Sequence, residues 1–172
     1  MTQAARVVLQ DAKYAIAKHS EYLQSEAFRV SWFSIVGLLR AVGHVLDKVD
    51  TKSSSAMKRA IEEKWMLLQK SRPEPHIFWG FIEIERNRFL KNYQHGINRA
   101  LVVPVLPKNS VVMVDCGNLG GGTVGEGYKL RSIIVDGHYA GSYEREVATE
   151  AYKWWKSYLD EVDNLARTYE AI

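Results

Sequence analysis

The chain has 172 residues and a net charge of +3, with 47% hydrophobic and 25% charged residues, which suits one globular domain with a core. Its single cysteine, Cys116, excludes an intrachain disulfide, and its longest apolar run, residues 30–39, is too short to span a bilayer. Residues 1–20 contain no signal-peptide pattern. These features favour a cytoplasmic protein with no membrane segment.

Four helices are predicted in the first part of the chain, because apolar residues recur there at helical spacing. They cover residues 3–23, residues 26–49 after an N-cap at Ser25, residues 56–70, and a stretch from about His76 to His95. The prolines of residues 72–75 separate the third helix from the fourth. Gly96 is placed to stop the fourth helix.

Valine-rich strands are predicted after the helices, over residues 101–106, 110–116 and 129–135. Pro104 lacks a backbone N–H, so the first strand is expected at the edge of its sheet. Asp136-Gly137 predicts a tight turn into a return strand that begins at residues 138–140. Ser142 then caps a last helix.

The predicted fold class is mainly α, and α+β overall: a helical bundle with a small antiparallel sheet inserted before the C-terminal helix. We expect a single domain over residues 1–172. Residues 1–97 form its helical part, residues 98–141 the sheet insertion, and residues 142–172 a helix that packs on the bundle.

Arg88, Asn92 and His95 are the first candidate site, because they lie four and seven residues apart on the predicted fourth helix and so share one face. RNA is cleaved without a metal when its 2′-hydroxyl attacks the adjacent phosphate. Histidine can move the proton, arginine can hold the phosphate, and an amide can orient either group. The alternative interpretation is that Arg88 pairs with Glu85 and His95 merely ends the helix.

Arg40, His44 and Asp47 form a second polar stripe, at spacings of four and three on the second helix. An acid one turn from a histidine can fix its tautomer and raise its pKa. We expect this stripe either to face the fourth helix and join Arg88 and His95, or to form a surface network of little energetic value.

The charge distribution favours a phosphate-bearing partner near the candidate helix. Residues 51–100 carry ten Lys/Arg and five Asp/Glu, whereas residues 141–172 carry four and seven. A local excess of positive charge attracts RNA, although it also simply keeps a surface soluble.

Two other kinds of site find little support in the sequence. The glycine-rich run 117–127 lacks the Gly-Lys-Ser/Thr ending of a P-loop and is not followed by a helix, so it is interpreted as a long loop. The five histidines and the lone cysteine show no short ligand spacing, so neither a metal nor a cofactor is expected.

Arg88 and His95, with six residues between them, resemble the R-x(4–6)-H motif of the HEPN superfamily, and the order of helices over residues 26–97 is similar. The resemblance implies a helical bundle that cuts RNA in toxin, defence or processing systems, and a homodimer that brings two motifs together. In many members the arginine is followed by Asn, Asp or His. Arg86-Asn87 matches that dipeptide while Arg88-Phe89 does not, so both arginines remain candidates.

Two functions follow as hypotheses. The first is a HEPN-like, metal-independent endoribonuclease, of the toxin or defence kind, with an antitoxin or another protein as a further partner. The second is a non-catalytic HEPN-like binding or assembly protein that recognises a nucleotide, a nucleic acid or a protein.

Overall fold

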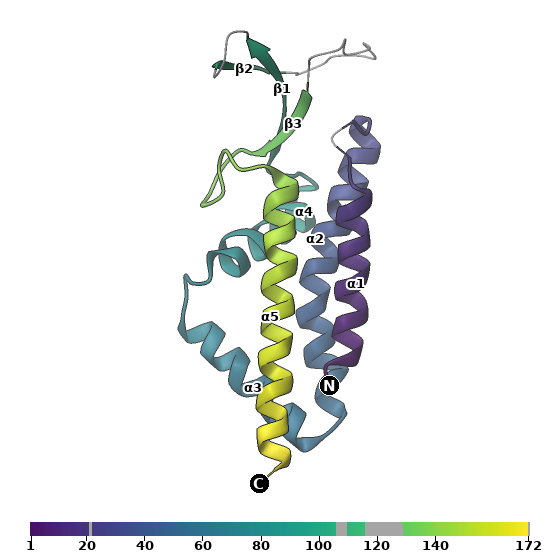
Figure 1. The fold of residues 1–172 in the computed structure, drawn as a ribbon, viewed down its shortest axis with the longest axis vertical. Helices are drawn as coiled ribbons and strands as arrows, with labels where there is room; N and C mark the ends of the chain where they lie inside the picture. The colour runs from purple at the N-terminus through teal and green to yellow at the C-terminus, as the bar shows by residue number, and fades with distance from the viewer. Residues whose placement is uncertain (21, 106–109, 116–128, 172) are drawn as a thin grey trace.

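The structure of the chain, a computed structural model, describes the backbone of residues 1–20, 22–105, 110–115 and 129–171 and the side chains of residues 1–20, 22–99 and 131–171. A helical bundle carries a small sheet at one end, and the sheet is inserted before the last helix (Figure 1). The expected fold class, mainly α and α+β overall, is therefore confirmed.

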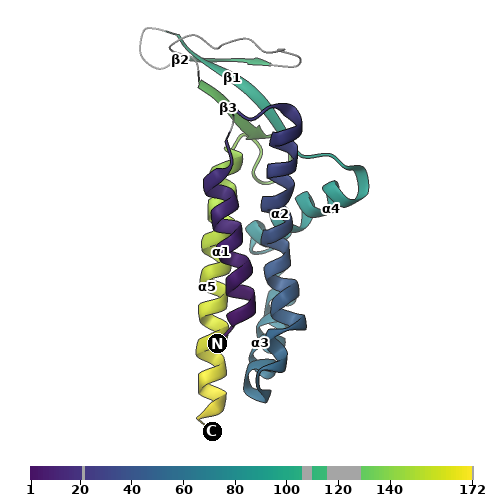
Figure 2. The same cartoon turned by 90° about the vertical axis from the view of Figure 1, so that its right-hand side faces the viewer.

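The bundle is built from long amphipathic helices. Helices α1 (Gln3–Lys18), α2 (Ser25–Lys48) and α5 (Glu144–Glu170) lie lengthwise beside one another, and α3 (Ser55–Lys70) packs on the lower part of α5 (Figures 1 and 2). A 3-10 turn, η1 (Asp50–Lys52), joins α2 to α3. The core includes Trp32, Leu39, Leu159 and Trp155, which are nearly inaccessible to solvent, so burial of these apolar faces provides the main stabilisation.

The fourth helical segment begins with a π-helix, η2 (Ile77–Ile82), which continues into α4 (Glu83–Asn92). Almost every side chain of η2 is buried against the bundle. Helix α4 is only partly buried and projects from the bundle near the sheet (Figure 2).

The sheet contains β1 (Ile97–Val105), β2 (Ser110–Asp115) and β3 (Lys129–Ile134) in the antiparallel order β2-β1-β3. The prediction that the Pro104 strand lies at the edge is wrong, because β1 is central. Pairing with β3 spans only Ile97 to Val102, whereas Pro104 pairs with Val111 of β2. Among the described strands, β1 therefore pairs at Pro104 with β2 alone, and the missing N–H of the proline costs no bond to β3.

The predicted return strand at residues 138–140 is also wrong. These residues form a turn in which Gly137 and Gly141 have positive φ angles of 76° and 82°. The N–H of Gly141 donates to the Ile134 carbonyl, so the chain reverses directly and only Tyr143 forms an isolated bridge to Ile133.

The predicted N-caps at Ser25 and Ser142 are wrong. The N-cap residues of α2 and α5 are Gln24 and Tyr143, and neither side chain makes a capping hydrogen bond. Ser54 does cap α3, since its hydroxyl accepts from the N–H of Met57.

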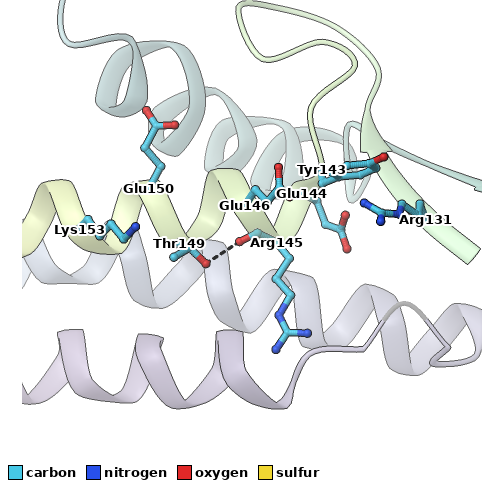
Figure 3. A pocket seen from close by; sticks show the side chains of 8 residues that line it. All are labelled: Arg131, Tyr143, Glu144, Arg145, Glu146, Thr149, Glu150 and Lys153. Carbon is cyan, nitrogen blue, oxygen red and sulfur yellow. Dashed lines mark hydrogen bonds between the residues drawn. The ribbon is translucent and has the colours of Figure 1, made fainter. Parts of the chain in front are cut away.

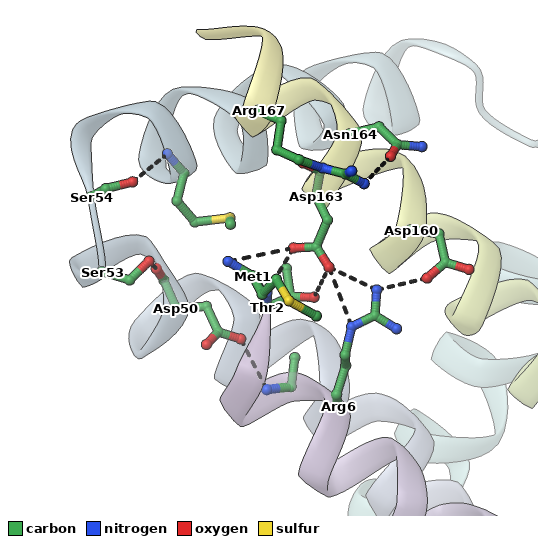
Figure 4. A network of polar contacts seen from close by, with 12 residues as sticks. Met1, Thr2, Arg6, Asp50, Ser53, Ser54, Asp160, Asp163, Asn164 and Arg167 are labelled. Atoms are coloured by element: carbon green, nitrogen blue, oxygen red, sulfur yellow. Dashed lines mark hydrogen bonds and ion pairs between the residues drawn. The ribbon is translucent and has the colours of Figure 1, made fainter. Parts of the chain in front are cut away.

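The start of α1 is capped by acids from distant parts of the chain (Figure 4). Asp50 accepts hydrogen bonds from the N–H groups of Ala4 and Ala5, at 3.0 and 2.9 Å. Asp163 of α5 accepts from the Thr2 N–H at 2.7 Å and pairs with Arg6 at 2.7 Å. These carboxylates satisfy the free amides at the positive end of α1.

Helix α2 with the turn that follows it, Ser25–Lys52, is long and apolar enough to cross a membrane by length and composition. The central helix of a bundle has the same properties. Its side chains Phe28, Trp32, Val36 and Leu39 are buried in the core.

Candidate functional site

The predicted stripe of Arg88, Asn92 and His95 on one helix is wrong in its geometry. Helix α4 ends at Asn92, and Tyr93 adopts a left-handed conformation with φ 53°. The chain therefore turns back before His95, and Asn92 remains an exposed residue of the last turn.

Glu85 nevertheless connects Arg88 with the backbone next to His95. Its side chain is buried, and its Oε1 accepts a hydrogen bond from Arg88 Nη1 at 2.7 Å. Its Oε2 accepts from Trp32 Nε1 at 3.3 Å and from the N–H of Gly96, the residue after His95, at 3.2 Å. The fit is close, because a Cβ at Gly96 would lie 1.5 Å from Arg88 Nη1.

Arg88 is held between two carboxylates. Besides Glu85, it contacts Asp136 in the turn after β3, whose two oxygens lie 2.7 and 2.8 Å from Nη2. Burial alone would lower the pKa of Arg88, but the hydrogen bond to Asp136 and the charges of both acids outweigh it and raise the pKa. The alternative interpretation, an Arg88–Glu85 pair, is therefore present in the structure.

His95 is half-buried, and its ring meets the edge of Phe28 at a centroid distance of 5.8 Å. Burial lowers the pKa of His95 below its ordinary 6.5, and the charges of Arg29 and Arg88 act in the same direction while Glu85 partly opposes them. The ring is consequently neutral at pH 7, the form that can accept a proton. Since Nδ1 is buried, only Nε2 can act on a molecule from outside.

Two further arginines near His95 were missed by the sequence analysis. Arg29 of α2 lies over the exposed ring of Tyr93 at 5.6 Å, and among the described residues it forms no ion pair with a carboxylate. Arg99 of β1 lies over Phe28 at 4.9 Å. Arg99 belongs to the basic excess of residues 51–100, but Arg29 lies outside it, and no local spacing connects an arginine of α2 with one of β1.

Arg86 and Asn87 contact each other rather than the Arg88 network. Arg86 Nη1 donates to Asn87 Oδ1 at 2.8 Å. On α2, Arg40 is half-buried, and burial together with the charge of Arg86 lowers its pKa, while Glu83 opposes this effect. Arg40 therefore lies in the electrostatic range of the Arg86-Asn87 dipeptide.

The other members of the α2 stripe do not join a site. His44 and Asp47 are exposed, and Asp47 pairs with the neighbouring Lys48 at 2.7 Å. This part of the stripe is the surface network that the second interpretation described.

Two regions singled out in the sequence, the glycine-rich run 117–127 and Cys116, lie outside the described residues. Within the described part of the chain, no group of three or more His, Cys, Asp and Glu side chains is arranged to hold a metal ion.

A hollow of about 570 Å3 at the start of α5 contains none of the predicted site residues. Arg131, Glu146 and Lys153 are among the charged residues that line it (Figure 3). Glu144, which also borders it, is buried and lies 3.6 Å from Nε2 of the buried His19. The mixed charge does not favour a phosphate here, so we do not assign RNA chemistry to this hollow.

The comparisons with known proteins give no relative: the chain matches no protein-family profile, no curated protein and no solved structure. Conclusions about function therefore depend on the geometry of the site.

Proposed function

We propose that the chain is a HEPN-like endoribonuclease that cuts RNA without a metal, with His95 as the proton acceptor and Arg88 as the phosphate-binding residue. The observation that carries the proposal is the Glu85 bridge, which fixes the Arg88 guanidinium and the backbone beside His95 with one buried carboxylate. Preorganised groups of this kind stabilise developing charge effectively.

The proposed reaction is an internal transfer of the phosphate. His95 Nε2 takes the proton of a 2′-hydroxyl, the 2′-oxygen forms a bond to phosphorus, and the bond to the 5′-oxygen breaks. Arg88 stabilises the charge on the phosphate oxygens. The departing 5′-oxygen takes a proton from solvent water, because His95 is neutral at pH 7, and the protonated His95 ring then returns its proton to the solvent.

The surroundings of His95 support RNA as the substrate. Arg29 supplies a positive charge with no carboxylate partner among the described residues, and Tyr93 offers an aromatic face that is 60% exposed. Aromatic faces stack on the bases of single-stranded RNA, and arginines bind its backbone.

The test is cleavage of a mixed single-stranded RNA in EDTA by wild type, His95→Ala and Arg88→Ala. We expect wild type to leave a 2′,3′-cyclic phosphate and each variant to be about 100- to 10,000-fold slower. Contaminating nuclease would survive both substitutions, so equal cleavage by all three proteins would contradict the proposal.

The second candidate function is a non-catalytic HEPN-like protein that binds RNA. It is favoured by the pairing of both terminal nitrogens of Arg88 with carboxylates. Its signature is RNA binding that weakens in Arg29→Ala while no protein preparation yields a cyclic phosphate.

A further inference from the structure

The turn that connects β3 to α5, residues 135–141, is held firmly beside Arg88. The N–H of Val135 donates to the Gly96 carbonyl at 3.0 Å. Further along, the His138 ring stacks on His76 at 3.9 Å, and the Tyr139 hydroxyl donates to Glu150 at 2.9 Å. These contacts position Asp136, which lies between them in the sequence.

The two acids that hold Arg88 differ in how easily they can leave it. The Glu85 side chain is 5% exposed and bonded to three partners, whereas the Asp136 side chain is 60% exposed and contacts Arg88 through Nη2 alone. An exposed pair of this kind contributes little net binding, so another anion can replace Asp136.

A carboxylate and a phosphate present oxygens to a guanidinium in the same way. We propose that Asp136 is a built-in competitor for RNA: it occupies, at Nη2 of Arg88, the place of a phosphodiester oxygen and keeps the site at rest. The inference rests on the proposed function. When RNA displaces Asp136, Glu85 keeps Arg88 in place through Nη1, so the arginine needs no repositioning.

The competitor role predicts that removing the Asp136 charge tightens RNA binding. We expect the Kd of the full chain for a labelled single-stranded RNA to fall about three- to tenfold in Asp136→Asn, measured by fluorescence anisotropy in EDTA. Glu62→Gln is the matched control, because the Glu62 side chain is similarly exposed, at 58%, pairs with Lys58 and lies on α3. It should bind RNA as wild type does.

A double variant shows whether the gain passes through Arg88. In Arg88→Ala/Asp136→Asn the RNA affinity should equal that of Arg88→Ala alone. Two results would overturn the competitor role: an equal gain in RNA affinity in Glu62→Gln, or a gain from Asp136→Asn that persists when Arg88 is replaced. Either result would mean that the loss of a negative charge acts generally on RNA binding.

The cleavage assay separates this inference from the proposed function. Tighter binding by Asp136→Asn that depends on Arg88, with no cleavage by any protein, supports the competitor and rejects the nuclease. Cleavage by wild type with unchanged binding and rate in Asp136→Asn supports the nuclease and rejects the competitor. Absence of RNA binding in every variant overturns both.

Discussion

Two arginines, at opposite ends of the bundle, each bridge a buried and an exposed carboxylate. Arg6 pairs with the buried Asp163 and with Asp160, whose side chain is 45% exposed; Arg88 pairs with the buried Glu85 and with Asp136, which is 60% exposed. Both acids of Arg6 lie on α5, whereas Asp136 lies in a turn after β3 (Figure 4 shows the Arg6 network). In both networks the buried acid holds the arginine, and we propose that RNA displaces the exposed acid only at Arg88.

The largest difference is expected when the acids are removed one at a time. Asp163→Ala should lower the free energy of unfolding by about 3–5 kcal/mol, because it leaves Arg6 and the amide of Thr2 without their buried acceptor. Asp136→Ala should lower it by less than about 1 kcal/mol. Urea unfolding followed by circular dichroism measures both, and a loss in Asp136→Ala as large as that in Asp163→Ala would show that Asp136 is not an easily displaced contact.

The pair of Arg88 and Glu85 can be disrupted by adding a side chain at the neighbouring Gly96. Gly96→Ala places a Cβ within 1.5 Å of Arg88 Nη1 and 2.7 Å of Glu85 Oε1, so the pair must separate. We expect a loss of about 1–3 kcal/mol in stability and RNA binding no stronger than that of Arg88→Ala.

Gly37→Ala is the control for that substitution, since nothing lies within 4 Å of its Cβ. Alanine at position 37, which is exposed in the middle of helix α2, should stabilise the chain by about 0.5–1 kcal/mol. Unimpaired RNA binding by Gly96→Ala would mean that the Glu85 bridge does not organise the site.

The pH dependence distinguishes the two ends of the bundle, because the histidine of the proposed reaction, His95, lies at the same end as Arg88. Burial lowers the pKa of His95 below 6.5, so the unfolded chain binds the proton more readily than the folded chain. This group's contribution to stability is present above pH 6.5 and is lost as the pH falls through the folded pKa.

Cleavage should follow the same group. The rate should stay constant from neutral pH down past 6.5 and fall only at lower pH, when the His95 ring becomes protonated. A cleavage profile with its acid limb above pH 6.5 would assign the proton transfer to another group.

The smallest effects are expected at His44 and Asp47 of α2, which are exposed and belong to neither the Arg6 nor the Arg88 network. His44→Ala and Asp47→Asn should each change stability by less than about 0.5 kcal/mol and leave RNA affinity as in wild type. Anisotropy titrations would detect a contribution, and a clear loss of affinity in either variant would return these residues to the site.

The sequence predicts the helices, because they depend on the local spacing of apolar residues. The helices corresponding to α2, α3 and α5 were recovered because their apolar residues follow helical spacing over several turns. The central position of β1 was not, since strand order depends on which distant segment pairs with each edge.

The site was recovered in part for the same physical reason. Arg88 and His95 were selected by spacing on a helix that in fact ends at Asn92, and the left-handed Tyr93 gave no sequence signal. Asp136 was interpreted only as a turn residue, because its partner lies 48 positions away. Long-range ion pairs leave no pattern in a single sequence.

The pairing of Ile97 with Ile134 brings the two ends of the sheet insertion together. The chain leaves the helical part and re-enters it at two residues that face each other across an antiparallel pair, about 5 Å apart. A two-residue hairpin turn suffices to span such a gap. We therefore expect that a short turn can replace residues 98–133 and leave the helices with Glu85 and Arg88 connected as before. The shortened protein would lose the contact of Arg99 with Phe28, and an unrelated domain could be grafted at the same two positions.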